Sequence, residues 1–186
     1  SILPTPAIGG VGLIENIDRM AHVAFAAPGE QILLIGETTG HLSTSIYARE
    51  FMNREDGPPP YVDPSTERRH GDFVRRLIKA GRITACHDIS DGGLLVAIAE
   101  MALAALSEGR EIGAAIQFPT KNVVPTAWCF GEDQARYIVT ATESATQGIL
   151  ADAADAKIPI DSIGLSGGAK LTLGPSDAIS LDELKH

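Results

Sequence analysis

The sequence contains few cysteines and few aromatic residues. Only Cys86 and Cys129 are present among 186 residues, and their separation does not match the C-x-x-C spacing of metal or redox sites. We therefore expect neither a disulfide framework nor a structural zinc site, and we interpret both cysteines as small buried residues in a reducing cytosol. Aromatic residues form 5% of the chain and hydrophobic residues 44%, which favours closely packed helix and sheet layers over an aromatic-rich β-sandwich.

The sequence also lacks an excess of positive charge. It carries 15 Lys and Arg against 24 Asp and Glu, so its net charge is −9. Duplex nucleic acid and anionic membranes need a basic surface and are not expected as partners, whereas a phosphorylated small molecule needs only one local pocket. The most apolar window, residues 94–106, is interrupted by Glu100 and is too short to cross a bilayer. We expect a cytoplasmic protein that does not contact a membrane.

Several common catalytic and nucleotide-binding motifs are missing. Gly9, Gly10 and Gly12 lack the third glycine and the strand-loop-helix context of a dinucleotide fingerprint, and no P-loop sequence occurs. No Ser-His-Asp arrangement or G-x-S-x-G elbow is recognisable either. The sequence therefore does not indicate a dinucleotide-binding fold of the Rossmann type, a P-loop nucleotide-binding protein or a serine hydrolase.

Strand and helix patterns alternate along the chain, with hairpins among them, so we expect an α+β fold with a mixed sheet covered by helices. The residues Pro4-Thr5-Pro6 predict a bend before the first strand, and Pro58 to Pro60 predict a rigid extended connector. The predicted strands are 11–17 (which 20–25 would extend), 31–35, 83–86, 112–118, 135–140, 160–165 and 169–173, the last two forming a hairpin across 166–168. The predicted helices run from Ser43 or Thr44 to about Met52, from 63 to 80 after an Asp63-Pro64 start, over 94–107 and over 143–156 after Thr142, with 123–129 a short helix or loop and a helix beginning near 180.

The first candidate ligand segment lies between a predicted strand and a predicted helix. Glycine lets the backbone approach a ligand, and a helix start offers free N–H groups, which suits a phosphate. Two aspartates would repel that phosphate unless they hold Mg²⁺ or face ribose hydroxyls. The alternative is a structural role. In that case Asp91 caps the helix, Asp88 holds the loop through backbone hydrogen bonds, and His87 is a structural residue whose ring nitrogens are hydrogen-bonded within the protein. The candidate residues are His87, Asp88, Ser90, Asp91, Gly92 and Gly93.

The second candidate segment is a polar turn just before a predicted strand. Glu132, Asp133, Gln134 and Arg136 occupy four of five successive positions. They can read a polar ligand or build an ion-pair turn. From the residues alone, an exposed charged turn is the preferred interpretation.

Four motifs occur in a specific order along the chain. They are PTPAIGGVGLIEN at 4–16, GPPP-x-VD at 57–63, HDISDGGLLVAIAEMA at 87–102 and FGEDQARYIV at 130–139. Together they closely resemble the C-terminal part of the phosphoribosylformylglycinamidine synthase subunit II (PurL) family, in the AIR synthetase-related superfamily. The resemblance covers nearly the whole chain.

This resemblance implies an ATP-dependent ligase step in purine biosynthesis, in which formylglycinamide ribonucleotide and ammonia from glutamine give formylglycinamidine ribonucleotide. It implies a three-layer α/β/α domain over 28–186, with 1–27 as the trailing strand or linker of a preceding ATP-binding-type domain. Catalytic residues, Mg²⁺ and ATP contacts would lie mostly upstream, so the chain alone should be inactive. Glu132, Asp133 and Gln134 would face an auxiliary nucleotide site.

The resemblance also implies partners, namely the upstream domains, a glutaminase subunit (PurQ) and a small bridging subunit (PurS). Two alternatives remain. The chain could be a non-catalytic structural or interface domain, or part of another ATP-dependent enzyme of the superfamily.

Overall fold

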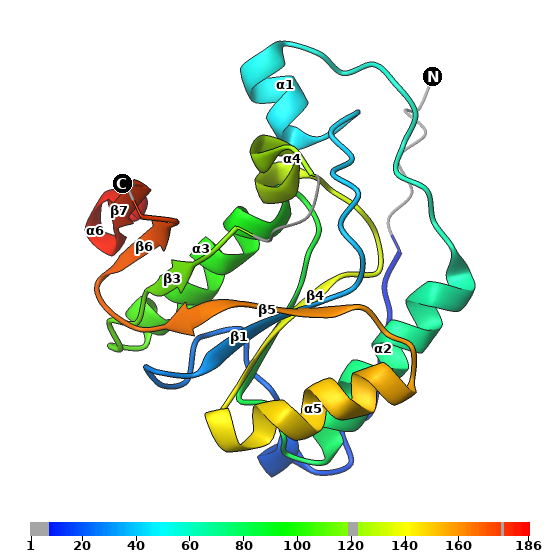
Figure 1. The fold of residues 1–186 in the computed structure, drawn as a ribbon, viewed down its shortest axis with the longest axis vertical. Coiled ribbons are helices and arrows are strands. Elements are labelled where there is room, and N and C mark those ends of the chain that lie inside the picture. Colours follow the sequence, from blue (N-terminus) through cyan, green and yellow to red (C-terminus); the bar gives the residue numbers. More distant parts are fainter. Residues whose placement is uncertain (1–7, 119–122, 176) are drawn as a thin grey trace.

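The computed structural model describes residues 8–118, 123–175 and 177–186, in which one seven-stranded sheet carries helices on both faces (Figure 1). The strand order is β2-β4-β1-β5-β3-β6-β7, and only the β3–β6 pair is parallel. The predicted mixed sheet is therefore confirmed. The strands are β1 (Gln31–Ile35), β2 (Ala85–Asp88), β3 (Ala114–Ile116), β4 (Tyr137–Ala141), β5 (Ile160–Ser166), β6 (Lys170–Leu173) and β7 (Asp177–Ser180).

Helix starts follow local capping chemistry. Asp63 accepts hydrogen bonds from the backbone N–H groups of Ser65 and Thr66 at the start of α2, and Thr142 caps α5 in the same way. The C-terminal helix has a full capping box between Ser180 and Glu183. The helices are η1 (Ile17–Arg19), α1 (Ile46–Met52), α2 (Pro64–Lys79), α3 (Gly93–Ser107), α4 (Pro125–Phe130), α5 (Glu143–Asp155) and α6 (Leu181–Leu184).

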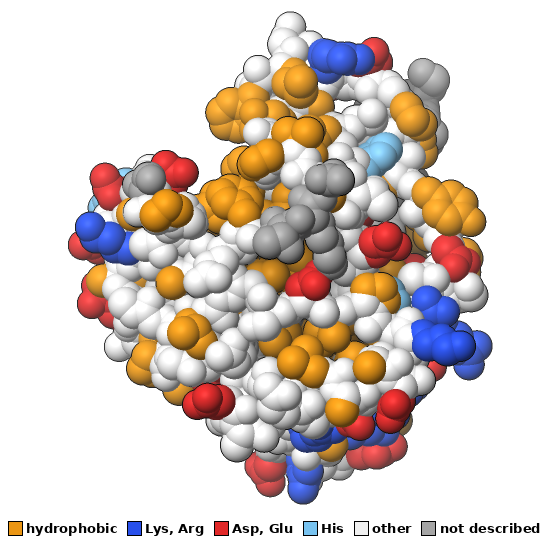
Figure 2. Space-filling view, in the orientation of Figure 1, with side chains coloured by type: hydrophobic (Ala, Val, Ile, Leu, Met, Phe, Trp, Pro, Cys, Tyr) orange, Lys and Arg blue, Asp and Glu red, His pale blue; other side chains and the backbone are white. Residues whose placement is uncertain are grey.

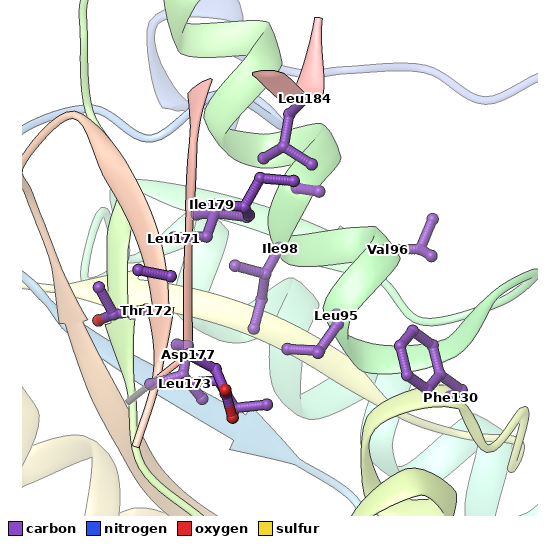
Figure 3. Close-up of a pocket in the computed structure, with 13 residues that line it drawn as sticks. Leu95, Val96, Ile98, Phe130, Leu171, Thr172, Leu173, Asp177, Ile179 and Leu184 are labelled. Carbon is purple, nitrogen blue, oxygen red and sulfur yellow. The ribbon is translucent and has the colours of Figure 1, made fainter. Parts of the chain in front are cut away.

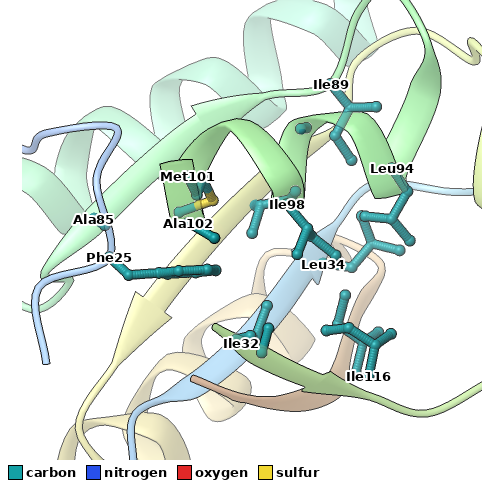
Figure 4. Close-up of a cluster of buried hydrophobic side chains, with 14 of the residues drawn as sticks. Phe25, Ile32, Leu34, Ala85, Ile89, Leu94, Ile98, Met101, Ala102 and Ile116 are labelled. Atoms are coloured by element: carbon teal, nitrogen blue, oxygen red, sulfur yellow. The ribbon is translucent and has the colours of Figure 1, made fainter. Parts of the chain in front are cut away.

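The sheet separates two hydrophobic clusters because successive side chains of a strand point to opposite faces. On β1, Ile32 and Leu34 pack on the face covered by α3, whereas Leu33 and Ile35 pack under α2 and α5. Figure 4 shows Ile32 and Leu34 facing Ile98 of α3. Helices thus cover both faces of the sheet, and the predicted α+β fold with α/β/α layers is confirmed.

The N-terminal segment does not form the predicted strand. Residues 8–14 have no regular structure, and 17–19 form the single turn η1. Val11 and Leu13 are fully exposed, since the described residues offer no strand to pair with them. Of the extension over 20–25, only His22 joins the sheet, through one isolated parallel bridge to Ala85. The bend at Pro4-Thr5-Pro6 lies outside the described residues.

The predicted hairpin between β5 and β6 is also wrong, because β3 lies between these two strands. Two glycines allow that insertion. A Cβ atom at Gly164 would overlap the carbonyl oxygen of Ala115, and one at Gly113 would overlap that of Lys170. Gly167 and Gly168 still turn the chain with positive φ angles of 140° and 69°, but the strands they join are not neighbours.

Some element boundaries differ from the prediction. Strand β2 begins and ends two residues later than expected, so His87 and Asp88 belong to the strand rather than to a loop. Helix α1 is capped by Ser45 rather than by Ser43 or Thr44, and Thr44 has a left-handed φ of 60°. Strand β7 was not predicted.

Candidate functional site

The turn between α4 and β4 is built around the Glu132 carboxylate. One oxygen, Oε1, accepts hydrogen bonds from the backbone N–H groups of Ile46 and Gly92, both at 2.8 Å. Ile46 is the first residue of α1, and Gly92 is the N-cap of α3. A carboxylate is favoured at this position because both helix starts carry positive partial charge. Glu132 therefore caps two helices that are far apart in sequence.

Asp133 fixes the loop that leads into α1. It is buried, with 7% of its surface exposed, and its carboxylate accepts a hydrogen bond from the Thr39 hydroxyl. It also accepts from the backbone N–H groups of Gly40 at 2.9 Å and His41 at 3.3 Å. The Glu132 N–H in turn donates to the His41 carbonyl at 2.9 Å. The loop over 39–41 is thus folded onto this turn.

Arg136 holds the turn from inside the protein, and its side chain is completely buried. The guanidinium donates to the carbonyls of Asp133 at 3.1 Å and Gly131 at 2.5 Å, and to the Thr38 hydroxyl at 3.2 Å. Burial lowers the pKa of Arg136, and the nearby Asp133 charge opposes that effect. Arg136 also lies 3.9 Å from the Asp133 carboxylate, so the turn contains an ion pair. The turn is largely buried, which differs from the exposed charged turn that the residues alone favoured.

The segment 87–93 approaches the same turn from β2 and α3. His87 contacts Glu100 at 3.0 Å through Nε2 and Asp88 at 3.3 Å through Nδ1. Asp91 does not cap α3, because the N-cap is Gly92, whose own N–H is bound by Glu132. Ser90 and Asp91 are exposed, as is Asp88.

The start of α3 also packs directly against the backbone of Phe130 and Gly131. A Cβ atom at Gly93 would lie 2.7 Å from the carbonyl carbon of Phe130, so glycine lets the two segments touch. No local pattern predicts the contact between Glu132 and Gly92, because the two residues lie forty positions apart in the chain. Asp91, by contrast, has the residue type of a cap but not the position.

Gln134 lies on the exposed side of the turn, beside a cleft of about 320 Å³. The cleft lies between the 37–41 loop, the proline-rich connector and the start of α2. Three carboxylates line it, so an anionic group entering it would meet negative charge. Its lining residues are Glu37, Thr39, His41, Pro60, Tyr61, Asp63, Thr66, Asp133, Gln134 and Ala135.

The described residues carry two further apolar surfaces. A groove of about 380 Å³ runs between α3 and strands β6 and β7, with Leu95, Ile98 and Ile179 pointing into it (Figure 3). The second surface covers α1 and the connector, where Phe51 and Tyr61 are 76% and 86% exposed. Figure 2 shows hydrophobic side chains gathered over this part of the molecule.

The thiols and acidic groups give no metal centre within the described ranges. Cys86 and Cys129 are free, and burial raises their pKa values to about 12 and about 11. Over residues 8–118, 123–175 and 177–186, no group of three or more His, Cys, Asp or Glu could hold a metal ion. In the same residues, no helix has the length and apolar character needed to span a membrane.

Comparison with known proteins gives close relatives over the whole chain. The subunit PurL of phosphoribosylformylglycinamidine synthase from Nitrobacter hamburgensis is 50% identical over 185 residues, covering 100% of this chain and 24% of that protein. PurL from Parvibaculum lavamentivorans is 52% identical over 186 residues, covering 99% of this chain and 24% of that protein. The chain therefore spans about a quarter of the length of these relatives.

Solved structures share the fold at low sequence identity. PurLQS from Thermotoga maritima matches with a TM-score of 0.71 and 16% identity, over 90% of this chain and 28% of that chain. T. maritima PurL has also been solved with FGAR (TM-score 0.70, 17% identity, 90% and 30% coverage). Its complex with ATP gives a TM-score of 0.68 at 15% identity, with 90% and 27% coverage.

A match to a domain family covers most of the chain. Residues 27–171 match the family described as AIR synthase related protein, C-terminal domain. The matched range contains both candidate segments and all strands from β1 to β5. The chain therefore belongs to the AIR synthase related protein family and carries its C-terminal domain.

Proposed function

We propose that this chain is the C-terminal domain of an ATP-dependent ligase that converts formylglycinamide ribonucleotide and ammonia into formylglycinamidine ribonucleotide. One observation carries the proposal: relatives named for this synthase are 50% and 52% identical to the chain over its full length. The chain covers only 24% of those proteins, so the activity is that of a longer polypeptide. In this proposal the chain contributes no catalytic residue.

The first 27 residues are proposed to contact a preceding domain. The described part of this segment, from residue 8, carries exposed apolar side chains at Val11, Leu13 and Ile14, which a neighbouring domain would bury. Burial begins at Ala24 and Phe25, and the family match begins at residue 27. These observations support a boundary near residue 27, with residues 28–186 as the domain itself.

The candidate ligand residues divide into two groups in this proposal. Glu132, Asp133, Gly92 and Gly93 hold the scaffold, because their polar groups or their lack of a side chain are used by internal contacts. Gln134 lines the cleft, and among the described residues its side-chain amide makes a single long hydrogen bond, 3.3 Å to the Glu132 carbonyl. The residues proposed to face a nucleotide at the auxiliary site are Gln134, His87, Asp88, Ser90 and Asp91. Because carboxylates line the cleft, Gln134 is proposed to face the base or ribose rather than the phosphates.

Mg²⁺ and ATP belong to the proposed longer enzyme. This chain's described residues do not fit a metal-phosphate site by themselves, since the Gly92 N–H is bound by Glu132 and no three metal-ligating side chains cluster. We therefore assign no catalytic step to them. The proposed partners are the upstream domains and the subunits PurQ and PurS, as the PurLQS assembly of T. maritima suggests, and the proposed location is the cytoplasm.

Phosphate release tests the ligase assignment. The 186-residue chain and the full-length protein from the same gene are each supplied with Mg-ATP, formylglycinamide ribonucleotide and ammonium. We expect turnover only in the full-length protein. Turnover by the short chain would overturn the assignment of the catalytic groups to the upstream part. Folded but inactive full-length protein would refute the ligase function, and selenide and thiamine monophosphate would then be tested as substrates of related enzymes.

A purely structural role is the second candidate, and the internal use of Glu132 and Asp133 favours it. Gln134→Ala in the full-length protein separates the two roles, because this exposed side chain contributes little to the fold. A fall in turnover with an unchanged melting temperature supports ligand contact. Unchanged turnover and an unchanged nucleotide content of the purified enzyme would support scaffolding alone.

A further inference from the structure

We infer that Glu132 is a positioning residue that couples helix α1 to the start of helix α3. Its Oε1 atom accepts from the Ile46 and Gly92 N–H groups, both at 2.8 Å. A single oxygen atom therefore occupies the positive ends of two helices. The two helix starts cannot separate unless one of these charge-assisted hydrogen bonds breaks.

Helix α1 depends on this connection. It has seven residues, too few for a stable helix in isolation, and it stands away from the sheet at one end of the molecule (Figure 1). Two further contacts stabilise α1. The Ser45 hydroxyl accepts a hydrogen bond from the Ala48 N–H at 3.1 Å, and the Tyr47 ring stacks on Phe130. Phe130 directly precedes Gly131 and Glu132, so this contact also attaches α1 to the same turn.

The start of α3 depends on the turn as well. Its N-cap is Gly92, with a φ of 81° and no side chain that could cap the helix. Glu132 supplies the missing carboxylate acceptor. The Ile89 N–H donates to the Arg136 carbonyl at 3.0 Å, which fixes the preceding loop to the other end of the turn.

This connection links the two segments in which the candidate ligand residues lie. The loop before α1 supplies Thr39 and His41 to the cleft, and the segment before α3 carries the exposed Ser90 and Asp91. Ordering of one segment is therefore transmitted to the other through Glu132. The relevance for ligand binding rests on the proposed function, whereas the coupling itself requires no ligand.

Hydrogen exchange of the 186-residue chain tests the coupling. Ser45→Ala removes the α1 cap without touching α3, and we expect about five-fold faster exchange over 46–50. If the two helices are coupled, Ser45→Ala also produces a smaller but measurable increase in the exchange rate over residues 92–96. Glu132→Ala should raise exchange in both segments by about ten-fold or more. In the double variant, the Ser45 change should add nothing over 92–96.

Glu132→Gln keeps an oxygen acceptor without the charge and provides the same test if the alanine variant fails to fold. Glu37→Ala, at an exposed cleft position, is the matched control and should leave both segments unchanged. A Ser45 effect confined to α1, or a Glu132 effect on one segment only, would overturn the coupling. A uniform increase in exchange rate that includes strand β4 would also overturn the coupling, because it would report global destabilisation. An inactive full-length enzyme would refute the proposed function without changing these exchange results.

Discussion

Replacing Arg136 should destabilise the protein more than any exposed charge change. The guanidinium is fully buried and donates to three oxygen acceptors, on Asp133, Gly131 and Thr38. An acceptor left without its donor costs about 1–3 kcal/mol, so three give at least about 3 kcal/mol. This agrees with the cost of about 3–5 kcal/mol for breaking a buried charge pair. We expect the free energy of unfolding to fall by about 3 kcal/mol in Arg136→Met and by more in Arg136→Ala, which also leaves a cavity.

Urea unfolding followed by two probes measures this loss. Far-ultraviolet circular dichroism reports the whole fold. The chain has one tryptophan, Trp128, which is buried in α4 just before the turn, so its fluorescence reports the local structure. In the Arg136 variants the fluorescence change should precede the circular dichroism change, because the turn opens first.

Arg68→Met is the matched control, since the Arg68 side chain is 85% exposed and its ion pair to Asp72 is long at 3.9 Å. It should change the free energy of unfolding by less than about 0.5 kcal/mol. The reasoning is refuted if Arg136→Met unfolds within about 1 kcal/mol of wild type. In that case the cost of burying the guanidinium would offset its hydrogen bonds.

Gly164→Ala should cost about 3 kcal/mol or more in urea unfolding, because the new Cβ overlaps the Ala115 carbonyl of the neighbouring strand. Cys86 and Cys129 have pKa values raised to about 12 and 11 by burial, so they stay neutral while unfolded thiols ionise. Stability should therefore be fully present below about pH 9 and fall as pH rises towards 11, more steeply than in a Cys86→Ala, Cys129→Ala variant. Hydrogen bonds at the start of α2 lower the pKa of Asp63 to about 2. Its contribution to folding stability should therefore persist at mildly acid pH and be lost only as the pH falls from about 4 through 2. A circular dichroism titration of Asp63→Ala should lack this acid loss.

Each of these predictions has a clear opposing outcome. Gly12→Ala, where a Cβ meets nothing within 4 Å, should be neutral, and an equal effect at both glycines would contradict the steric argument. Identical alkaline profiles with and without the cysteines would contradict the thiol argument. An acid transition of Asp63→Ala identical to wild type would do the same for the α2 cap.

Local chemistry explains what could be predicted from the sequence. Asp63 before Pro64 and Thr142 before Glu143 mark their helices within a few residues, and the apolar run from Ile32 to Ile35 identifies a strand buried on both faces. The mixed sheet follows from the alternation of such elements. Both candidate segments also lie next to each other in space, in contact through Glu132 and Gly92.

The errors concern pairing between distant parts of the chain. The Ser166-Gly167-Gly168 turn is typical of a hairpin, and nothing near it indicates that residues 114–116 would separate the two strands. Alternating apolar residues at Val11 and Leu13 predict a strand, but a strand needs a partner that the described residues do not supply. The role of Glu132 likewise depends on backbone groups 40 and 86 positions away.

The insertion of β3 between β5 and β6 constrains the order in which the chain can fold. Strand β3 pairs with its parallel partner β6 through three residue pairs, from Ala114–Leu171 to Ile116–Leu173, and these contacts have to close a long loop. The segment 160–173 can meanwhile close quickly on itself as a hairpin, since such contacts are local. If that hairpin forms first, it would occupy the strand edges that β3 requires and would have to reopen before the sheet is complete. Refolding should therefore include a slow phase that is limited by the replacement of one strand by another. Strands β6 and β7 and helix α6 should be the last elements to become protected from hydrogen exchange.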